Sequence, residues 1–327
     1  MALPLEQPRA RVSLDGVPVG GVVELEVRAP GAFLAGRFCV VFAMGAAPAL
    51  GLSDFAAMGN VPVTIELSVD GLGYAQVLSG QVEAIRIDLA ANTATLRGRD
   101  LTALLIDAEI SESFVNQTAS EVATAMALRH GLTPNVTQTY QPVGQYYQID
   151  HARTALSVGA RATTEWNLLC RLAEAEGFGV SVSGGALNFG PVPLAGESLV
   201  TPGSFIGLEV DLVTALPAAV AVRSWNSRNK QVVAQSTGTG TVTNIVRPNM
   251  SAAQAGTYAA SYLAMVQLHG KVLLGKMPGE TALVVGSGLL LAGTNSALDD
   301  SYVVTGLVRR LNGRDGFVQM VKAYAVG

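Results

Sequence analysis

Apolar and polar residues alternate along much of the first hundred positions, which predicts β-strands. The alternation is regular at 23–27 and again at 63–69. Since neighbouring side chains of a strand point to opposite faces, every second residue of these stretches should face inward. The predicted inward set is Val23, Leu25, Val27, Val63, Ile65, Leu67 and Val69. Asp-Gly pairs at 15–16 and 70–71 tolerate positive φ and predict hairpin turns, so the region is typical of a barrel or sandwich.

The middle of the chain changes to the periodicity of α-helices. Thr118 and Glu121 form a capping box that predicts a helix over about 119–130. A second helix is expected over 164–177, where apolar residues recur at helical spacing and a glycine ends the run. A hairpin with a Gly-Gly turn should follow over 178–189. These elements predict a compact α/β module.

The last third returns to the strand pattern, with one long helix inside it. A capping box of Ser251 and Gln254 predicts this helix at about 252–269. The chain then finishes with a predicted hairpin over 302–324, which has the same form as one predicted earlier at 74–98. Two β regions that each end in a long paired ribbon suggest an internal duplication.

The patterns together predict a mainly β fold with an α+β insert. The chain of 327 residues is longer than one hydrophobic core usually supports, so several domains are expected. We expect a first β domain at 1–98, an α/β middle module at 99–204, and a second β domain at 205–327 that carries the long helix.

Composition favours an assembly subunit over a free monomer. Hydrophobic residues make up 49% of the chain and charged residues only 14%, which excludes a disordered protein and indicates surface that is buried or faces a partner. The net charge of −4 and the scattered positions of the 21 Lys and Arg residues predict no specific nucleic-acid binding. No apolar run is long enough to span a bilayer. The first residues lack a secretory signal, so we expect assembly in a cytoplasm.

The sequence holds no complete motif for catalysis, for a cofactor or for a metal. Residues 286–288 (Gly-Ser-Gly) lack the spacing of a nucleophile elbow and are typical of a tight turn. Residues 238–240 (Gly-Thr-Gly) lack the third glycine of a dinucleotide site and are typical of a flexible loop. We therefore predict no catalytic, cofactor-binding or metal-ligating residues, no cofactor and no enzyme activity.

The three histidines lie in different modules without metal-ligand spacing. His130 and His269 each precede a glycine at a predicted helix end, where a capping role is favourable. His151 belongs to the polar cluster Asp150–Arg153, which we interpret as a surface or interface feature.

Two carboxylate pairs have the residue types that a glycoside hydrolase needs. They are Glu174 with Glu176, at a helix end, and Asp299 with Asp300, in a loop. We interpret both pairs as solvated carboxylates, since the first lies on the polar side of a helix end and the second in a loop.

The tryptophans and cysteines also have structural interpretations. Trp166 lies at buried helical spacing and Trp225 ends a strand, so each is predicted to be a core or interface anchor. Cys39 and Cys170 are far apart in apolar surroundings and are predicted to be reduced, buried thiols.

Five ordered motifs resemble the late-control protein D family of phage tail hubs, which is related to the N-terminal part of type VI secretion spike proteins. The motifs are 98–105 (GRDLTALL), 129–132 (RHGL), 142–148 (PVGQYYQ), 164–169 (TEWNLL) with 176–178 (EGF), and 298–304 (LDDSYVV). Together they span roughly residues 10–325.

The resemblance implies two tube-like β-barrel domains that flank a small α/β module, assembled as a homotrimer in the virion tail baseplate. Two barrels from each of three subunits would form a pseudo-sixfold ring that joins a six-fold tail tube to a three-fold spike. The implied partners are other copies of the chain, the tail tube or a tube-initiator protein, a separate spike protein, and baseplate wedge or tape-measure proteins. DNA would pass through the lumen without specific binding. The resemblance assigns no contact residues.

Two alternatives remain open at this point. One is a tail-associated component that degrades the cell wall or binds glycans, which would use the helix and hairpin module at 164–189 and the carboxylate pairs. The other is the hub of a non-contractile tail, which shares the barrel architecture.

Overall fold

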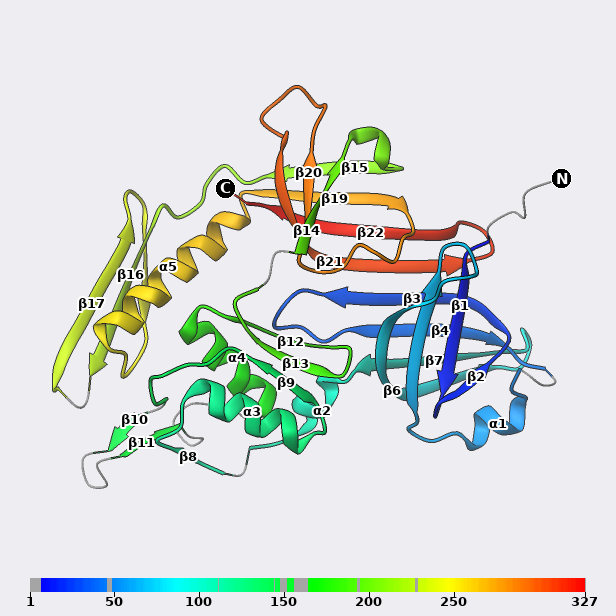
Figure 1. The fold of residues 1–327 in the computed structure, drawn as a ribbon, viewed down its shortest axis with the longest axis horizontal. Helices are drawn as coiled ribbons and strands as arrows, with labels where there is room; N and C mark the ends of the chain where they lie inside the picture. Colours follow the sequence, from blue (N-terminus) through cyan, green and yellow to red (C-terminus); the bar gives the residue numbers. More distant parts are fainter. Residues whose placement is uncertain are drawn as a thin grey trace.

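The chain folds as two β regions that share one sheet, with two smaller layers beside them (Figure 1). The computed structural model describes residues 7–45, 49–110, 112–143, 145–147, 152–155, 164–192, 195–226 and 229–326. Each part has its own cluster of buried apolar side chains.

The first β region curls around a core drawn from all of its long strands. Its elements are β1 (Arg9–Leu14), β2 (Val17–Val19), β3 (Val22–Pro30), β4 (Arg37–Ala43), α1 (Leu52–Ala57), β5 (Pro62–Ser68), β6 (Ala75–Asp88) and β7 (Thr93–Asp100). The strand order is β3-β4-β7-β6-β5-β1-β2. Leu25, Phe42 and Ile65 are completely buried at its centre.

Five of the seven predicted inward positions are buried, and two predictions are wrong. Val23 is 51% exposed because a β-bulge between Val22 and Glu24 interrupts the alternation where β3 pairs with β4. Val69 is 43% exposed because β5 ends one residue earlier, at Ser68. The predicted turn at 15–16 is confirmed, since both of its residues have positive φ.

The second β region is built on the predicted C-terminal hairpin. Its elements are β14 (Ala195–Val200), the 3-10 helix η1 (Pro202–Ser204), β15 (Gly207–Leu212), β19 (Lys271–Pro278), β20 (Ser287–Leu291), β21 (Asp300–Asn312) and β22 (Gly316–Ala325). β15, β19, β22 and β21 pair in that order, while β20 joins β21 and carries β14 beside it in parallel. Tyr302 and Leu273 are completely buried in the core of this region.

The two β regions join edge to edge through β3 and β21. These strands pair antiparallel from Gly306 opposite Pro30 to Asn312 opposite Glu24. Across this seam the Arg310 Nε donates to Glu26 Oε2 at 2.6 Å. One 13-stranded sheet therefore runs through both regions, and the predicted mainly β fold class is confirmed.

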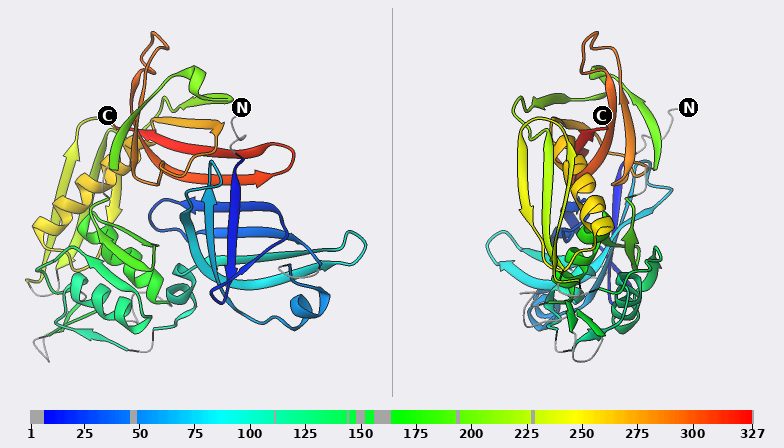
Figure 2. Two further views of the ribbon diagram at one scale, coloured as in Figure 1. Left: turned by 45° about the vertical axis from the view of Figure 1, so that its right-hand side comes forward. Right: turned by 90° about the vertical axis from the view of Figure 1, so that its left-hand side faces the viewer.

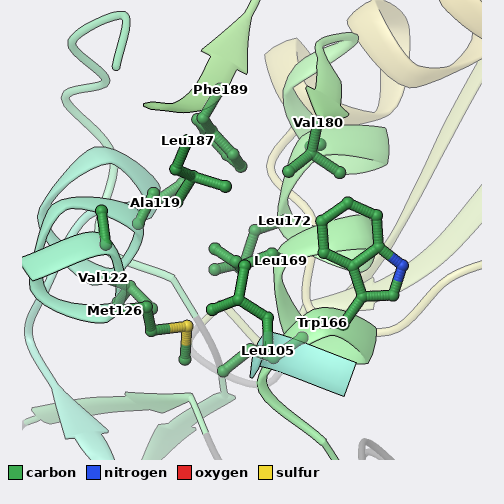
Figure 3. Close-up of a cluster of buried hydrophobic side chains, with 14 of the residues drawn as sticks. Leu105, Ala119, Val122, Met126, Trp166, Leu169, Leu172, Val180, Leu187 and Phe189 are labelled. Atoms are coloured by element: carbon green, nitrogen blue, oxygen red, sulfur yellow. The ribbon is translucent and has the colours of Figure 1, made fainter. Parts of the chain in front are cut away.

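The middle module combines helices with two small three-stranded sheets. Its elements are α2 (Thr102–Asp107), β8 (Phe114–Val115), α3 (Ala119–Arg129), β9 (Thr133–Val136), β10 (Gln145–Tyr147), β11 (Ala152–Ala155), α4 (Glu165–Glu176), β12 (Gly179–Ser183) and β13 (Ala186–Gly190). Figure 3 shows Met126 and Val122 of α3 facing Leu169 of α4, with Leu187 and Phe189 of β13 beside them.

Local hydrogen bonds explain why the two predicted helices begin and end where the sequence indicated. The Thr118 hydroxyl accepts a bond from the Glu121 N–H, and the Glu121 carboxylate accepts one from the Thr118 N–H. The Thr164 hydroxyl caps α4 in the same way, and Gly177 ends α4 in the left-handed conformation with φ of 71°. Both helix predictions are confirmed.

The fourth part is a three-stranded sheet with one helix on it. It comprises β16 (Ala219–Asn226), β17 (Gln231–Gly238), β18 (Val242–Val246) and α5 (Ala252–Leu268), which confirms the predicted long helix. β16 lies between β17 and β18. α5 packs its buried residues Ala255, Tyr258 and Ala259 against this sheet and also contacts α4. The domain borders drawn from the sequence remain predictions.

Candidate interaction surfaces

The side chains that the sequence singled out do not converge on one site. Among the described residues, no three His, Cys, Asp or Glu side chains lie together as ligands for a metal ion. No helix in the described part of the chain is long and apolar enough to cross a membrane. The Asp150–Arg153 cluster lies outside the residues whose side chains the structure describes.

The two helix-end histidines have different partners. His269 Nδ1 lies 2.8 Å from the carbonyl oxygen of Met265 in the last turn of α5, which confirms its predicted capping role. His130 Nε2 instead lies 2.7 Å from Glu165 Oε2. Its imidazole therefore joins the end of α3 to the first turn of α4.

Glu165 is the centre of a charged cluster that the sequence patterns did not predict. Its side chain is only 2% exposed and contacts both Arg129 and His130, while Arg129 also binds Glu112. The hydrogen bond to Glu112 is the largest cause that raises the pKa of Arg129, and the bond to Glu165 adds to it against the opposing effect of burial. A buried carboxylate needs such partners, so the cluster fixes how α3 and α4 meet. One sequence feature could have indicated this cluster: Glu165 is an acidic residue at the first position of a helix whose neighbouring positions are largely apolar.

The two carboxylate pairs lie in different surroundings. Glu174 is exposed on α4, whereas Glu176 is partly buried, and this burial raises its pKa. Hydrogen bonds from Thr294 lower the pKa of Asp299, and Asp300 binds Lys271 at 2.5 Å. Asp299 and Asp300 therefore order their loop and the neighbouring strand β19.

The tryptophans and cysteines differ in their burial. Trp166 is 6% exposed within the middle module, as predicted for a core anchor. Trp225 is 53% exposed on β16, so it is not a core anchor, and its predicted alternative role at an interface stays a prediction. Both cysteines are free and partly buried. Burial and, to a lesser extent, the Glu174 carboxylate raise the pKa of the Cys170 thiol to about 12, so this thiol stays protonated and unreactive at neutral pH.

A cleft of about 650 Å³ lies where the first β region, the second β region and the middle module meet. Asp100 and Arg309 line it from opposite β regions. Burial raises the pKa of Asp100, although its carboxylate accepts hydrogen bonds from the N–H groups of Gly36 and Thr102. Arg309 is 4% exposed and donates to the carbonyl oxygens of Glu280 and Leu283. Asp100 thus ties the β3–β4 connection to the start of α2. Arg309 ties β21 to the segment that connects β19 and β20.

The shape of the chain matches solved structures of tail proteins, although no protein-family profile and no curated protein sequence matches it. A tail protein from Neisseria meningitidis superposes with a TM-score of 0.73 at 14% identity, covering 98% of this chain and 97% of that one. A 43 kDa tail protein of prophage MuSo2 from Shewanella oneidensis gives 0.71 at 13% identity, with coverage of 97% and 98%.

The likeness extends to secretion machinery. An E. coli component of the type VI secretion system gives a TM-score of 0.63 at 13% identity, covering 97% of this chain and 77% of that one. These identities are low, so the comparison concerns the fold. The resemblance drawn from the sequence motifs is confirmed at that level: this chain has the fold of phage tail proteins and of a related type VI secretion component.

Proposed function

We propose that the chain is a structural hub subunit of a contractile phage tail or a related injection particle, located in the tail baseplate. The observation that carries this proposal is the near-complete match of the chain to two tail proteins, 97% or more in both directions. A match over the whole length supports a shared architectural role better than a match to one domain would.

The proposed mechanism is symmetry matching by a homotrimeric ring. Each chain carries two β regions joined edge to edge through β3 and β21, so three chains would present six such regions. The ring would join a six-fold tail tube or tube initiator to a separate three-fold spike protein, with DNA passing through the lumen. Wedge and tape-measure proteins are further proposed partners, and assembly would take place in the host cytoplasm.

Light scattering of the purified protein tests the proposed stoichiometry. We expect a native mass three times the 33.8 kDa of one chain, and binding of three spike chains when the candidate spike protein is added. A hexamer would indicate a tube or adaptor ring instead, and a persistent monomer would overturn the hub. The presence or absence of a sheath gene beside the hub gene distinguishes a contractile from a non-contractile tail.

We further propose that the hub is not an enzyme. The partly buried Glu176 beside the exposed Glu174 supplies the residue types of a hydrolase within the described part of α4. Zymography on peptidoglycan should show no clearing with the wild-type protein. Clearing that disappears in Glu174→Gln or Glu176→Gln would support the cell-wall-degrading alternative.

A further inference from the structure

Acidic residues are distributed very unevenly along the chain, although Lys and Arg are not. Residues 212–279 contain six Lys and Arg residues and no Asp or Glu, whereas residues 99–211 contain twelve Asp and Glu against five Lys and Arg. The first stretch comprises the three-stranded sheet β16–β18, helix α5 and most of β19. One part of the molecule is therefore purely cationic beside a strongly acidic neighbour.

The cationic part exposes an apolar sheet face. α5 covers one face of the β16–β18 sheet, and Figures 1 and 2 show no described element on the other. Trp225, Val232 and Val246 are 53%, 64% and 74% exposed on this outer face. Trp225 pairs with Val232 across β16 and β17, and Arg223 pairs with Val246 across β16 and β18.

Arg223 supplies a positive charge at the centre of this face. Its side chain is exposed, and no described carboxylate forms an ion pair with it. An exposed aromatic and aliphatic patch around an arginine has the composition of an interface core rather than of ordinary surface. The partner should therefore offer apolar side chains together with carboxylates.

The same chain carries such a surface at the free edge of β15. This strand pairs only with β19, so its other side is unpaired among the described strands. Glu209 and Asp211 lie on one face of β15, both exposed and without a described basic partner. Ile206 and Leu212 beside them are 61% and 59% exposed. Unpaired edges with apolar flanks are surfaces that assembly protects.

We propose that the outer face of the β16–β18 sheet docks on the β15 edge of a second copy of the chain, so that Arg223 of one copy meets Glu209 and Asp211 of the next. Figure 1 places β15 and the β16–β18 sheet at separate parts of the molecule. A contact between two different patches is head-to-tail, and repetition of such a contact closes a ring when the rotation allows it. The inference rests on the proposed homotrimer and names the surfaces that would build it.

The test compares the native mass of full-length variants by light scattering over a range of protein and salt concentrations. Arg223→Glu and Asp211→Arg should each raise the concentration needed for half-assembly at least tenfold, and Trp225→Gln should raise it as well. The double variant Arg223→Glu/Asp211→Arg should assemble at a concentration close to that of the wild type, because the exchanged charges attract each other again. Arg314→Glu in the exposed β21–β22 turn is the matched control and should assemble like the wild type. All these side chains are exposed, so we expect every variant to fold. Circular dichroism checks this.

The docking surface and the trimeric hub can fail separately in this experiment. A wild-type trimer that dissociates in the single variants and re-forms in the double variant supports both. A trimer that persists unchanged in Arg223→Glu and Trp225→Gln overturns the docking surface but leaves the trimeric hub intact. This holds even if the two variants no longer bind some other, acidic protein. A wild-type protein that stays monomeric overturns both.

Discussion

Leu169 of α4 lies at the centre of the middle module, completely buried against α3 and β13 (Figure 3). Leu169→Ala removes apolar contacts and leaves a cavity, so we expect a loss of about 2–5 kcal/mol in the free energy of unfolding. Urea unfolding followed by circular dichroism measures this loss. Leu128→Ala on α3 is the control, because Leu128 is 63% exposed and its truncation should change stability little. Equal losses in the two variants would contradict the packing described for α4.

Glu176 should lower the stability of the fold as pH rises, whereas most carboxylates of folded proteins raise it. Burial raises the pKa of its carboxyl in the folded chain above the ordinary value of 4.5, so the folded state holds this proton more tightly than the unfolded state. The group therefore costs stability as pH rises from about 4.5 through the raised folded pKa, and the cost persists above it.

Glu176→Gln should remove this cost. We expect the melting temperature of the variant, relative to the wild type, to be higher at pH 7 than at pH 3. Calorimetry at the two pH values measures the difference, and Glu174→Gln serves as the exposed control with no such change. A difference of the opposite sign would mean that Glu176 is stabilised as a carboxylate.

For single residues, the sequence predicted burial correctly only where the local periodicity determines which side chains face the core. Trp166 follows helical periodicity and is buried as predicted. Trp225 also follows a strand pattern, but the sheet that contains it is covered on one face only, which the pattern cannot reveal. The cluster around Glu165 joins helices whose meeting point depends on tertiary packing, so spacing alone could not identify it.

Helix α3 depends on its cap, Thr118, which directly precedes its first residue. Thr118→Ala removes the hydroxyl that accepts from the Glu121 N–H and should cost about 1 kcal/mol of unfolding free energy. Thr118→Ser keeps the hydroxyl and should recover most of the loss. Thermal unfolding of the two variants under identical conditions measures the difference. Equal melting temperatures for Ala and Ser would show that the cap does not stabilise the fold.

Gly177 both ends α4 and allows α5 to approach. It adopts φ of 71°, and an added Cβ would lie 2.3 Å from Ser261 Oγ of α5. Gly131 after α3 has a similar φ of 68° but open space around its Cα. Gly131→Ala should therefore cost about 1 kcal/mol from backbone strain alone. Gly177→Ala should cost more, because the Ser261 side chain must rotate away or α5 must shift.

Chemical denaturation measures the two glycine variants side by side. The excess loss in Gly177→Ala reports the contact between α4 and α5. Losses of the same size in both variants would mean that α5 accommodates the extra methyl group without strain.

Helix boundaries were predictable because caps act within one turn of the chain. α3, α4 and α5 each begin directly after the Thr or Ser that the sequence indicated. The short helices α1 and α2 follow Gly51 and Leu101, neither of which forms a side-chain capping hydrogen bond, and neither helix was predicted. The pairing of β3 with β21 depends on residues far apart in the chain, so no local pattern could indicate it.

The seam between the two β regions should govern whether they unfold together. Arg310→Glu places a second carboxylate beside Glu26, where the wild type has an ion pair at 2.6 Å. We expect a loss of about 1 kcal/mol and a broader or divided calorimetric transition. Arg314→Glu changes the same charge in the adjoining turn and should keep one sharp transition. An unchanged transition in Arg310→Glu would show that strand pairing alone holds the seam.

The β3–β21 seam also has a consequence for how the protein is made. Glu26 leaves the ribosome 284 residues before its partner Arg310, an interval of roughly 15 to 60 s at ordinary rates of synthesis. During that time β3 lacks the neighbour that later covers its edge, and an uncovered strand readily pairs with another nascent chain. Slow translation or a scarcity of chaperones should therefore send this protein into aggregates before the last hairpin arrives, and a gene shortened within that hairpin should yield mostly insoluble product.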